Sequence, residues 1–302
     1  MTSIWLLILV ISVGCLALPE IPTVKHPNQD LIDQAEQVPS IEHPNQQLID
    51  QAVQRLANVQ GRIIQGSDTT IDRYPWQASL EYNGNHICGA VILTNDFVLT
   101  AAHCVQNTIS DYVVHVGSAS RTASGGSRHN VQQGKLHEDF YNGASPSNGA
   151  FPYDIAVLLL RDPITYNSNK QPIGLTAVTN SVLATYDSSD CVITGWGRNE
   201  NNVLPDILQM TNVKVLTDNT CRVFAGNYLR DNLHICVDGV DESGGCNGDS
   251  GGPLACKVGN NYELAGVTSF VFGQCLTSSP TVYAETYGLR EWIATAMDNL
   301  SL

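Results

Sequence analysis

The sequence predicts an all-β protein of antiparallel strands, arranged as a sandwich or a barrel. From Trp76 onward, short apolar runs recur along most of the chain. Gly, Asn, Asp and Pro interrupt these runs at short intervals, and only the C-terminal end carries apolar residues at clear helical spacing. Short strands separated by frequent turn residues are typical of antiparallel sandwiches and barrels.

Each strand is expected where an apolar run lies between turn residues. The expected strands are, in order, 77–82, 87–94, 97–101, 112–116, 155–160, 191–196, 208–216, 254–258, 263–270 and 281–284. The expected helix follows Gly288. Its apolar face is predicted from residues three and four apart, which are Leu289, Trp292, Ile293, Ala296 and Leu300.

Residues 1–17 form an apolar segment that is typical of a secretory signal peptide, with cleavage after Ala17. The segment is too short for a transmembrane helix. No later segment approaches the roughly 20 apolar residues that a membrane span needs. We therefore expect a secreted, extracellular protein with no membrane association.

Residues 18–62 contain an internal repeat, because the sequence 26–35 recurs with small changes as 43–52. Two copies are too few for a solenoid. Each copy could form a short amphipathic helix after its Pro-Asn start. Two interpretations stay open: a duplicated, mostly mobile tether, or a pro-segment that docks on the rest of the chain.

Charge and cysteine content exclude several classes. The formal net charge of -14 argues against nucleic-acid binding, which needs clustered Lys and Arg. Nine cysteines become eight once Cys15 leaves with the signal peptide, and an even number in an exported protein predicts disulfides. The eight allow 105 pairings, among which the sequence alone does not choose. No C-x-x-C pair occurs, so a zinc site is not expected.

The glycine-rich stretch 246–254 surrounds a candidate nucleophile, Ser250. The pattern Gly248-x-Ser250-x-Gly252 also matches the elbow of α/β-hydrolases, in which an acid and then a histidine follow the serine. That alternative fails because the last histidine in the chain is His234. Glycines before and after the serine let the backbone turn sharply and bring N–H groups close to a substrate.

The remaining order, His then Asp then Ser, has candidates in His103 and Asp154. Asp154 precedes the apolar run 155–160, so its carboxylate is expected to be buried and to need a partner. The His103 Nδ1 atom would serve.

Three segments together resemble the signature segments of the chymotrypsin-like (trypsin fold) serine endopeptidases: 100–104, 154–158 and 248–253. The resemblance covers residues 63–302, roughly four fifths of the chain. It implies two six-stranded antiparallel β-barrels with a cleft between them and a C-terminal α-helix packed on the second barrel. It also divides the chain into a signal peptide (1–17), an activation pro-segment (18–62) and a protease domain (63–302).

The resemblance further assigns roles to single residues. His103, Asp154 and Ser250 would be catalytic, with the backbone N–H groups of Gly248 and Ser250 as the oxyanion hole. A cut after Arg62 would free Ile63, whose ammonium would pair with Asp249. The implied disulfides are Cys88–Cys104, Cys191–Cys256, Cys221–Cys236 and Cys246–Cys275.

The specificity pocket follows from the same resemblance. Gly244, with Gly245, falls at the floor of the pocket, where a trypsin-like pocket has an aspartate. Without that carboxylate, a Lys or Arg side chain of a substrate would be buried there without a partner. Val271 and Thr281 stand at the walls, which resembles the elastase-like pattern. Ser269 would begin the strand that pairs with the substrate backbone. We expect cleavage after small aliphatic residues, with chymotrypsin-like or collagenolytic specificity, or a non-catalytic homologue, as alternatives.

We expect protein or peptide substrates, an activating trypsin-like protease, protein inhibitors as possible partners, and a monomer. No cofactor or metal is expected. The loop that binds calcium in some relatives needs several carboxylates, and there is no Asp or Glu between Asp111 and Glu138.

Overall fold

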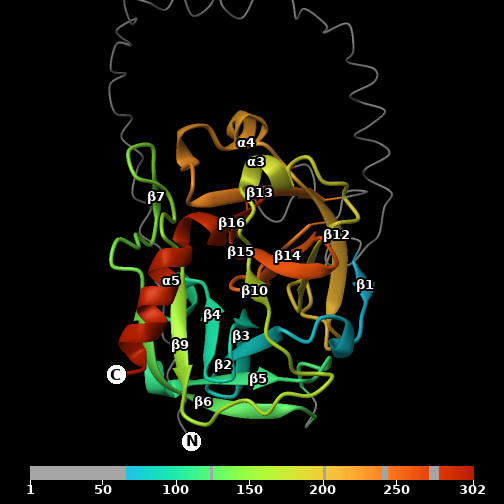
Figure 1. The fold of residues 1–302 in the computed structure, drawn as a ribbon, viewed down its shortest axis with the longest axis vertical. Helices are drawn as coiled ribbons and strands as arrows, with labels where there is room; N and C mark the ends of the chain where they lie inside the picture. The colour runs from blue at the N-terminus through green and yellow to red at the C-terminus, as the bar shows by residue number, and fades with distance from the viewer. Residues whose placement is uncertain (1–65, 123–124, 200–201, 240–243, 272–278) are drawn as a thin grey trace, which may run out of the picture. The chain divides into compact units, whose positions relative to one another are not determined.

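The fold is two closed six-stranded antiparallel β-barrels followed by a C-terminal helix (Figure 1), which confirms the predicted class. The computed structural model describes residues 66–122, 125–199, 202–239, 244–271 and 279–302. All of them belong to one compact unit that spans residues 60–302.

The first barrel closes in the strand order β2-β3-β4-β9-β6-β5. Its strands are β2 (Gln77–Tyr82), β3 (Asn85–Ile92), β4 (Phe97–Thr100), β5 (Tyr112–Val116), β6 (Ser127–Leu136) and β9 (Ala156–Leu160). Asn83 and Gly84 join β2 to β3 with φ angles of 51° and 75°, the conformation that an Asn-Gly hairpin turn favours. Leu80, Leu99 and Leu158 fill the interior and are fully buried.

The second barrel follows the order β12-β11-β14-β15-β16-β13 and closes through the β12–β13 pairing. Its strands are β11 (Cys191–Gly195), β12 (Gln209–Val215), β13 (His234–Gly239), β14 (Pro253–Val258), β15 (Asn261–Val271) and β16 (Thr281–Glu285). Two short strands extend it, β1 (Ser67–Asp68) on β12 and β10 (Gly174–Leu175) on β15. A separate hairpin pairs β7 (Ala144–Ser145) with β8 (Gly149–Ala150).

Two barrel strands were absent from the sequence prediction, β6 and β13. In β6 only His129 and Val131 are buried, because most of its other side chains are polar and lie partly or fully in solvent. β13 is six residues long and ends in Asp238 and Gly239. Neither strand has an apolar run long enough to stand out, so the closure of each barrel was not visible from periodicity alone.

The helices also differ from expectation. The structure adds α3 (Asn180–Leu183) and α4 (Asp218–Ala225), for which the sequence analysis predicted no helix. The side chain of Thr217 caps α4 by accepting a hydrogen bond from Thr220 N at 3.2 Å. The C-terminal helix, α5 (Thr286–Leu300), contacts β15 as expected, but also β9 and β6 of the first barrel.

The two barrels approach each other closely beside Ser250. Gly89 N in β3 donates a hydrogen bond to Ser250 O at 2.7 Å. A Cβ atom on Gly89 would lie 2.7 Å from Gly252 Cα, closer than nonbonded carbon atoms approach. Glycine at position 89 therefore permits the contact that brings the second barrel against the first.

Three of the four disulfides implied by the family resemblance lie within the described residues: Cys88–Cys104, Cys191–Cys256 and Cys221–Cys236. Cys246 is also disulfide-bonded. Its expected partner, Cys275, lies outside the described residues. The first disulfide joins β3 to the turn that carries His103.

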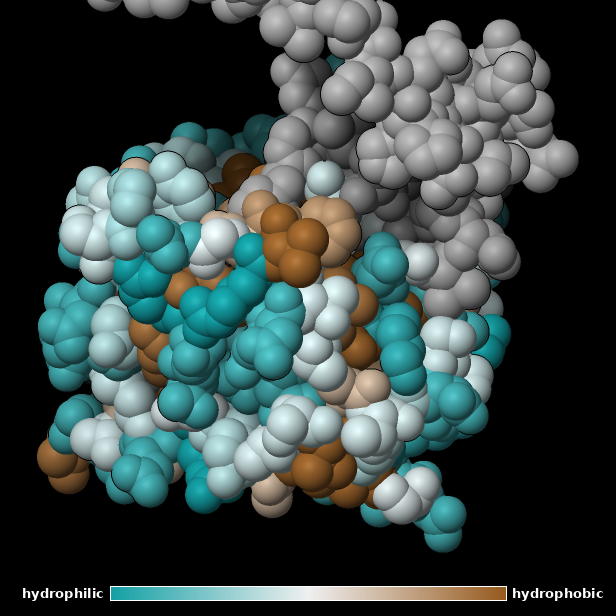
Figure 2. Space-filling model, turned by 90° about the horizontal axis from the view of Figure 1, so that it is seen from above, coloured by the Kyte–Doolittle hydropathy of each residue, from teal (hydrophilic) through white to brown (hydrophobic). Residues whose placement is uncertain are grey.

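Viewed from the end at which α3 and α4 lie, the surface is largely hydrophilic with scattered apolar areas (Figure 2). On α4 the side chains of Val223 and Phe224 are exposed. Within the parts of the chain that the structure describes, no helix has the length and apolar composition to cross a membrane.

The two disulfides within the second barrel should contribute unequally to stability. Cys191 and Cys256 are 65 residues apart and Cys221 and Cys236 are 15 apart. A chain-entropy model gives about 4 kcal/mol for the longer loop and about 3 kcal/mol for the shorter one. In denaturant unfolding of the uncleaved chain, Cys191→Ala/Cys256→Ala should therefore lower the free energy of unfolding more than Cys221→Ala/Cys236→Ala. The reverse order would contradict the entropic explanation.

Candidate active site

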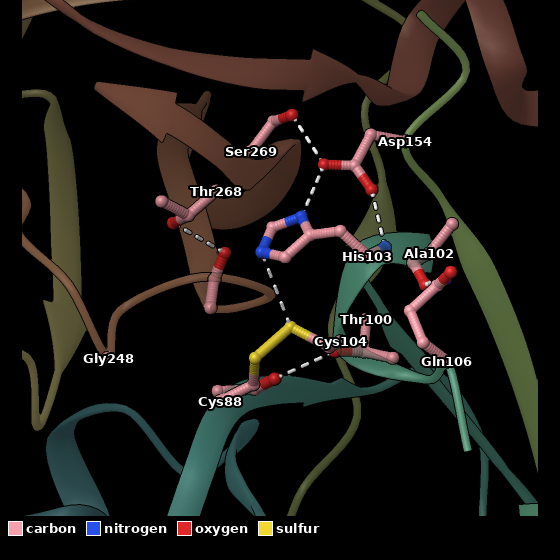
Figure 3. The surroundings of a disulfide bond; sticks show 12 residues. Cys88, Thr100, Ala102, His103, Cys104, Gln106, Asp154, Gly248, Thr268 and Ser269 are labelled. Carbon is pink, nitrogen blue, oxygen red and sulfur yellow. Dashed lines mark hydrogen bonds and ion pairs between the residues drawn. A yellow bond between two sulfur atoms is a disulfide. The ribbon is translucent and has the colours of Figure 1, made fainter. Parts of the chain in front are cut away.

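His103 and Asp154 meet at the rim of the first barrel (Figure 3). His103 lies in a 3-10 turn (Ala102–Cys104) that follows β4, and Asp154 directly precedes Ile155 and β9. The His103 Nδ1 to Asp154 Oδ2 distance is 2.7 Å, and His103 N donates to Asp154 Oδ1 at 2.9 Å. Since a carboxylate only accepts, Nδ1 carries the ring proton and Nε2 is left as the acceptor.

Ser269 of β15 completes the surroundings of Asp154 from the second barrel. Its Oγ donates to Asp154 Oδ2 at 2.5 Å. Asp154 has no exposed surface, and an ionised carboxylate in that position is costly unless donors surround it. Three donors from both barrels therefore hold this one side chain.

His103 and Ser250 line the same cavity, which has a volume of about 290 Å³. Its lining residues are His103, Phe151, Cys246, Asn247, Ser250, Thr268, Ser269, Phe270 and Val271. In the described structure Ser250 Oγ makes no hydrogen bond to His103 Nε2, which instead lies 3.7 Å from Cys104 Sγ. Hydrogen bonds between a nucleophile and its base are often long without substrate and shorten when it binds.

The N–H groups of Gly248 and Ser250 are oriented by the carbonyls of their own peptide units. Asn247 O accepts from Arg198 N at 2.8 Å, and Asp249 O accepts from Gly252 N at 2.8 Å. In a trans peptide the N–H points opposite to the C=O. Neither N–H donates to another described residue. Both are thus available to a substrate oxygen beside Ser250.

Two glycines make this turn possible. Gly248 and Gly251 have φ angles of 105° and 79°, which glycine adopts at little cost. A Cβ on Gly251 would also lie 2.3 Å from Thr100 Oγ1. A larger residue there would push the serine loop away from the first barrel.

His86, which the sequence analysis missed, supports the same turn. Its Nε2 lies 3.1 Å from Gly248 O, and its Nδ1 lies 2.8 Å from Ser79 Oγ. Burial lowers the pKa of His86 to about 4, so the ring is neutral at pH 7. Nε2 then donates to the carbonyl while Nδ1 accepts from the hydroxyl. The available signal was a histidine two residues before Cys88, directly before the apolar run that begins at Ile87.

Asp249 is buried behind the serine. Its Oδ1 accepts from Gly197 N at 2.7 Å and its Oδ2 from Cys246 N at 2.9 Å. Burial raises the pKa of Asp249 to about 6, although both hydrogen bonds favour the ionised form. No described Lys, Arg or His forms an ion pair with this carboxylate. The expected partner Ile63, like Arg62, lies outside the described residues.

The wall residues of the expected pocket are cross-strand neighbours. Val271 in β15 pairs directly with Thr281 in β16, which places both side chains on one face of the sheet. Val271 lines the cavity, whereas Gly244, Gly245 and Thr281 are not among its lining residues. A Cβ on Gly245 would lie 3.3 Å from Thr281 Cγ2, so Thr281 already occupies the space beside this glycine.

One cluster of metal-type ligands occurs among the described residues, formed by Cys88, His103 and Cys104. The two sulfur atoms are bonded to each other in a disulfide, so they are not available as thiolate ligands. This cluster therefore offers one imidazole and no thiolate as ligands.

The comparisons agree with this fold and site. The family model described as Trypsin matches residues 63–293. "Fibrinolytic enzyme, isozyme C" of Lumbricus rubellus is 36% identical over 247 residues, covering 76% of this chain and 98% of the relative. "Trypsin delta" of Drosophila melanogaster is 32% identical over 243 residues, covering 79% and 89%. "Transmembrane protease serine 9" of Rattus norvegicus is 32% identical over 247 residues, covering 79% of this chain and 22% of the relative.

Two six-stranded barrels with a histidine, an aspartate and a serine at their junction define the chymotrypsin-like class of folds. Within that class, the chain belongs to the trypsin family, whose members are serine endopeptidases.

The stability of the uncleaved chain should depend on pH through Asp249. The pKa of this carboxyl is about 6 in the folded chain against an ordinary 3.8, so the folded state binds the proton more tightly than the unfolded state. The free energy of unfolding should therefore fall as pH rises through that interval, by on the order of 3 kcal/mol. Asp249→Asn should lack this component.

Denaturant unfolding of both proteins between pH 3.5 and 7.5, at roughly half-unit steps, measures the difference directly. Other groups that titrate in the same range affect both proteins alike and cancel in the comparison. Parallel stability curves for the wild type and Asp249→Asn would contradict the raised pKa.

Proposed function

We propose that the chain is a serine endopeptidase, made as an inactive precursor, that cleaves peptide bonds after small aliphatic residues. One observation carries the proposal. The buried Asp154 carboxylate fixes His103 Nδ1 at 2.7 Å, and His103 lines the same cavity as Ser250. Membership of the trypsin family supports the reaction class.

The chemistry would proceed in two halves. Ser250 Oγ attacks the substrate carbonyl while His103 Nε2 takes its proton, and Asp154 stabilises the imidazolium that forms. The N–H groups of Gly248 and Ser250 stabilise the oxyanion. His103 then gives the proton to the leaving amine, which breaks the C–N bond and leaves an acyl-enzyme. Water, deprotonated by the same nitrogen, releases the acid and restores Ser250.

Activation by cleavage after Arg62 has a physical basis at Asp249. A carboxylate buried without a cation is unfavourable, as its raised pKa indicates. The new ammonium of Ile63 would supply the missing charge. Pairing would stabilise the ionised form and the loop that carries Gly248 and Ser250.

The pocket preference rests on Val271 and Thr281. Their branched side chains share one face of the sheet, and Val271 lines the cavity. No carboxylate lies at Gly244 or Gly245 to pair with a substrate Lys or Arg. Small aliphatic side chains fit such a site best. Chymotrypsin-like or collagenolytic specificity is the alternative within the same reaction, and a non-catalytic homologue is the alternative outside it.

The proposal extends to the setting in which the enzyme works. Residues 1–17 would direct secretion and residues 18–62 would be the pro-segment. The partners would be protein or peptide substrates, an activating trypsin-like protease and protein inhibitors. The protease would act as a monomer without a cofactor.

Limited proteolysis tests the activation and the nucleophile together. Treatment with trypsin should give a new N-terminus at Ile63 and activity on an Ala-Ala-Pro-Val anilide. Ser250→Ala should be cut at the same bond and keep the same circular dichroism spectrum and thermal midpoint, but lose turnover by at least about 10⁴-fold because the nucleophile is absent. Full activity of the cleaved Ser250→Ala protein would exclude the mechanism.

Widening the pocket tests the specificity. Val271→Gly/Thr281→Gly should raise kcat/KM for Phe relative to Val at the residue before the cleaved bond by at least about tenfold, since hydrophobic pockets discriminate by about 1 to 3 kcal/mol. Val223→Ala on the exposed face of α4 is the control and should leave the ratio unchanged. An Arg substrate that is cleaved as fast as a Val substrate by the wild type would overturn the pocket assignment.

A further inference from the structure

Three aromatic rings stack on one another next to Asp154, and one of them belongs to the residue that directly precedes it. The His137 ring lies between those of Tyr153 and Trp292, with centroid distances of 4.3 Å and 4.7 Å and an interplanar angle of 26° in both pairs. His137 follows β6, Tyr153 precedes Asp154, and Trp292 belongs to α5. Figure 1 shows α5 beside β9, the strand that Asp154 precedes.

The backbone of Tyr153 adopts a conformation that its side chain disfavours. Its φ angle is 57°, in the left-handed region that glycine and asparagine enter most easily. Ile155 N donates to Tyr153 O at 2.8 Å, which makes Asp154 the central residue of a three-residue turn. The position of the Asp154 carboxylate therefore depends on a strained neighbour.

His137 contacts both sides of this turn. Its ring stacks on Tyr153, and its backbone N donates to Ile155 O at 3.1 Å. Asp139 N donates to His137 Nδ1 at 3.2 Å, which fixes the ring orientation. On the far side, Trp292 Nε1 donates to Glu138 Oε2 at 2.7 Å and holds the indole over the imidazole.

Burial also favours the neutral form of the middle ring of the stack. It lowers the pKa of His137, against the opposing effects of Glu138 and Asp139, while Lys135 acts in the same direction as burial. A neutral imidazole stacks between two aromatic faces without the need to hydrate a charge.

We propose that the rings of His137 and Trp292 hold Tyr153 in its left-handed conformation and thereby position Asp154 for catalysis. This inference rests on the proposed function of Asp154 as the residue that orients His103. His137 and Trp292 are not among the residues that line the cavity, and they are therefore positioning residues. Docking of the C-terminal helix is then a requirement for the geometry of the active site, in addition to its role in stability.

A double-mutant cycle between Trp292 and Tyr153 tests the proposal. Trp292→Leu should lower kcat of the activated enzyme about tenfold, equivalent to about 1.4 kcal/mol, with KM unchanged. In a Tyr153→Asn background the same substitution should lower kcat less than about twofold, because asparagine tolerates the left-handed region. Trp292→Phe keeps a ring on His137 and should retain most of the wild-type kcat.

A second readout does not depend on turnover. The proton resonance of the His103 Nδ1–H group, which is hydrogen-bonded to Asp154, should shift or broaden in the Trp292→Leu variant. When Trp292→Leu is added to the Tyr153→Asn variant, the resonance should stay as it is in Tyr153→Asn alone. His137→Leu should reproduce the effect of Trp292→Leu. Met297→Ala, a half-buried position on the same helix outside the stack, is the matched control. It should lower the thermal midpoint without changing kcat or the resonance.

The outcomes separate this inference from the proposed function. Loss of kcat in Trp292→Leu that persists in the Tyr153→Asn background would overturn the positioning role, as would an unchanged His103 resonance. If the wild-type enzyme shows no peptidase activity but the His103 resonance still responds to Trp292→Leu, the proposed function fails. The structural coupling between Trp292 and Asp154 would still hold in that case. Should Trp292→Leu not fold, His137→Leu carries the same cycle.

Discussion

The structure depends on the burial of one carboxylate. Asp154 has no contact with solvent, so the protein must surround it with donors, and these come from both barrels. His103 supplies its ring and its backbone N–H from the first barrel, and Ser269 supplies a hydroxyl from the second. The electrostatic requirement of a single side chain thereby fixes the ring of His103 and ties the two halves of the fold together.

The rest of the geometry around Ser250 depends on close contacts between main-chain segments of the two barrels. Gly89 allows β3 to bond to the main chain at Ser250, and Gly251 fits against Thr100, where any side chain would collide. The peptide units on either side of Gly248 and Ser250 are held by the hydrogen bonds that their carbonyl oxygens accept. The serine loop is thus defined by main-chain contacts, for which glycine is the necessary residue.

Motif order in the sequence was sufficient to predict that His103, Asp154 and Ser250 share one site, because each motif combines a reactive side chain with a buried strand or a glycine turn. The two barrels were predicted by the family resemblance that these motifs carry, whereas the strand pattern alone predicted only a sandwich or a barrel. Periodicity failed for β6 and β13, whose pairing is set by neighbours that are distant in sequence. It also failed for α4, a short helix that depends on its Thr217 cap and on burial of Cys221 and Ala225. His86 escaped notice because its role exists only once β3 meets the serine loop.

The neutral ring of His86 has a consequence for the range of conditions in which the serine loop keeps its shape. Because burial brings its pKa to about 4, the proton that it donates to the Gly248 carbonyl stays on the same nitrogen across mildly acidic and neutral solution. The contact between His86 and the Gly248 carbonyl is therefore insensitive to acidity over that span. A change in the serine loop on mild acidification is instead expected at Asp249, because its pKa of about 6 lies in that interval.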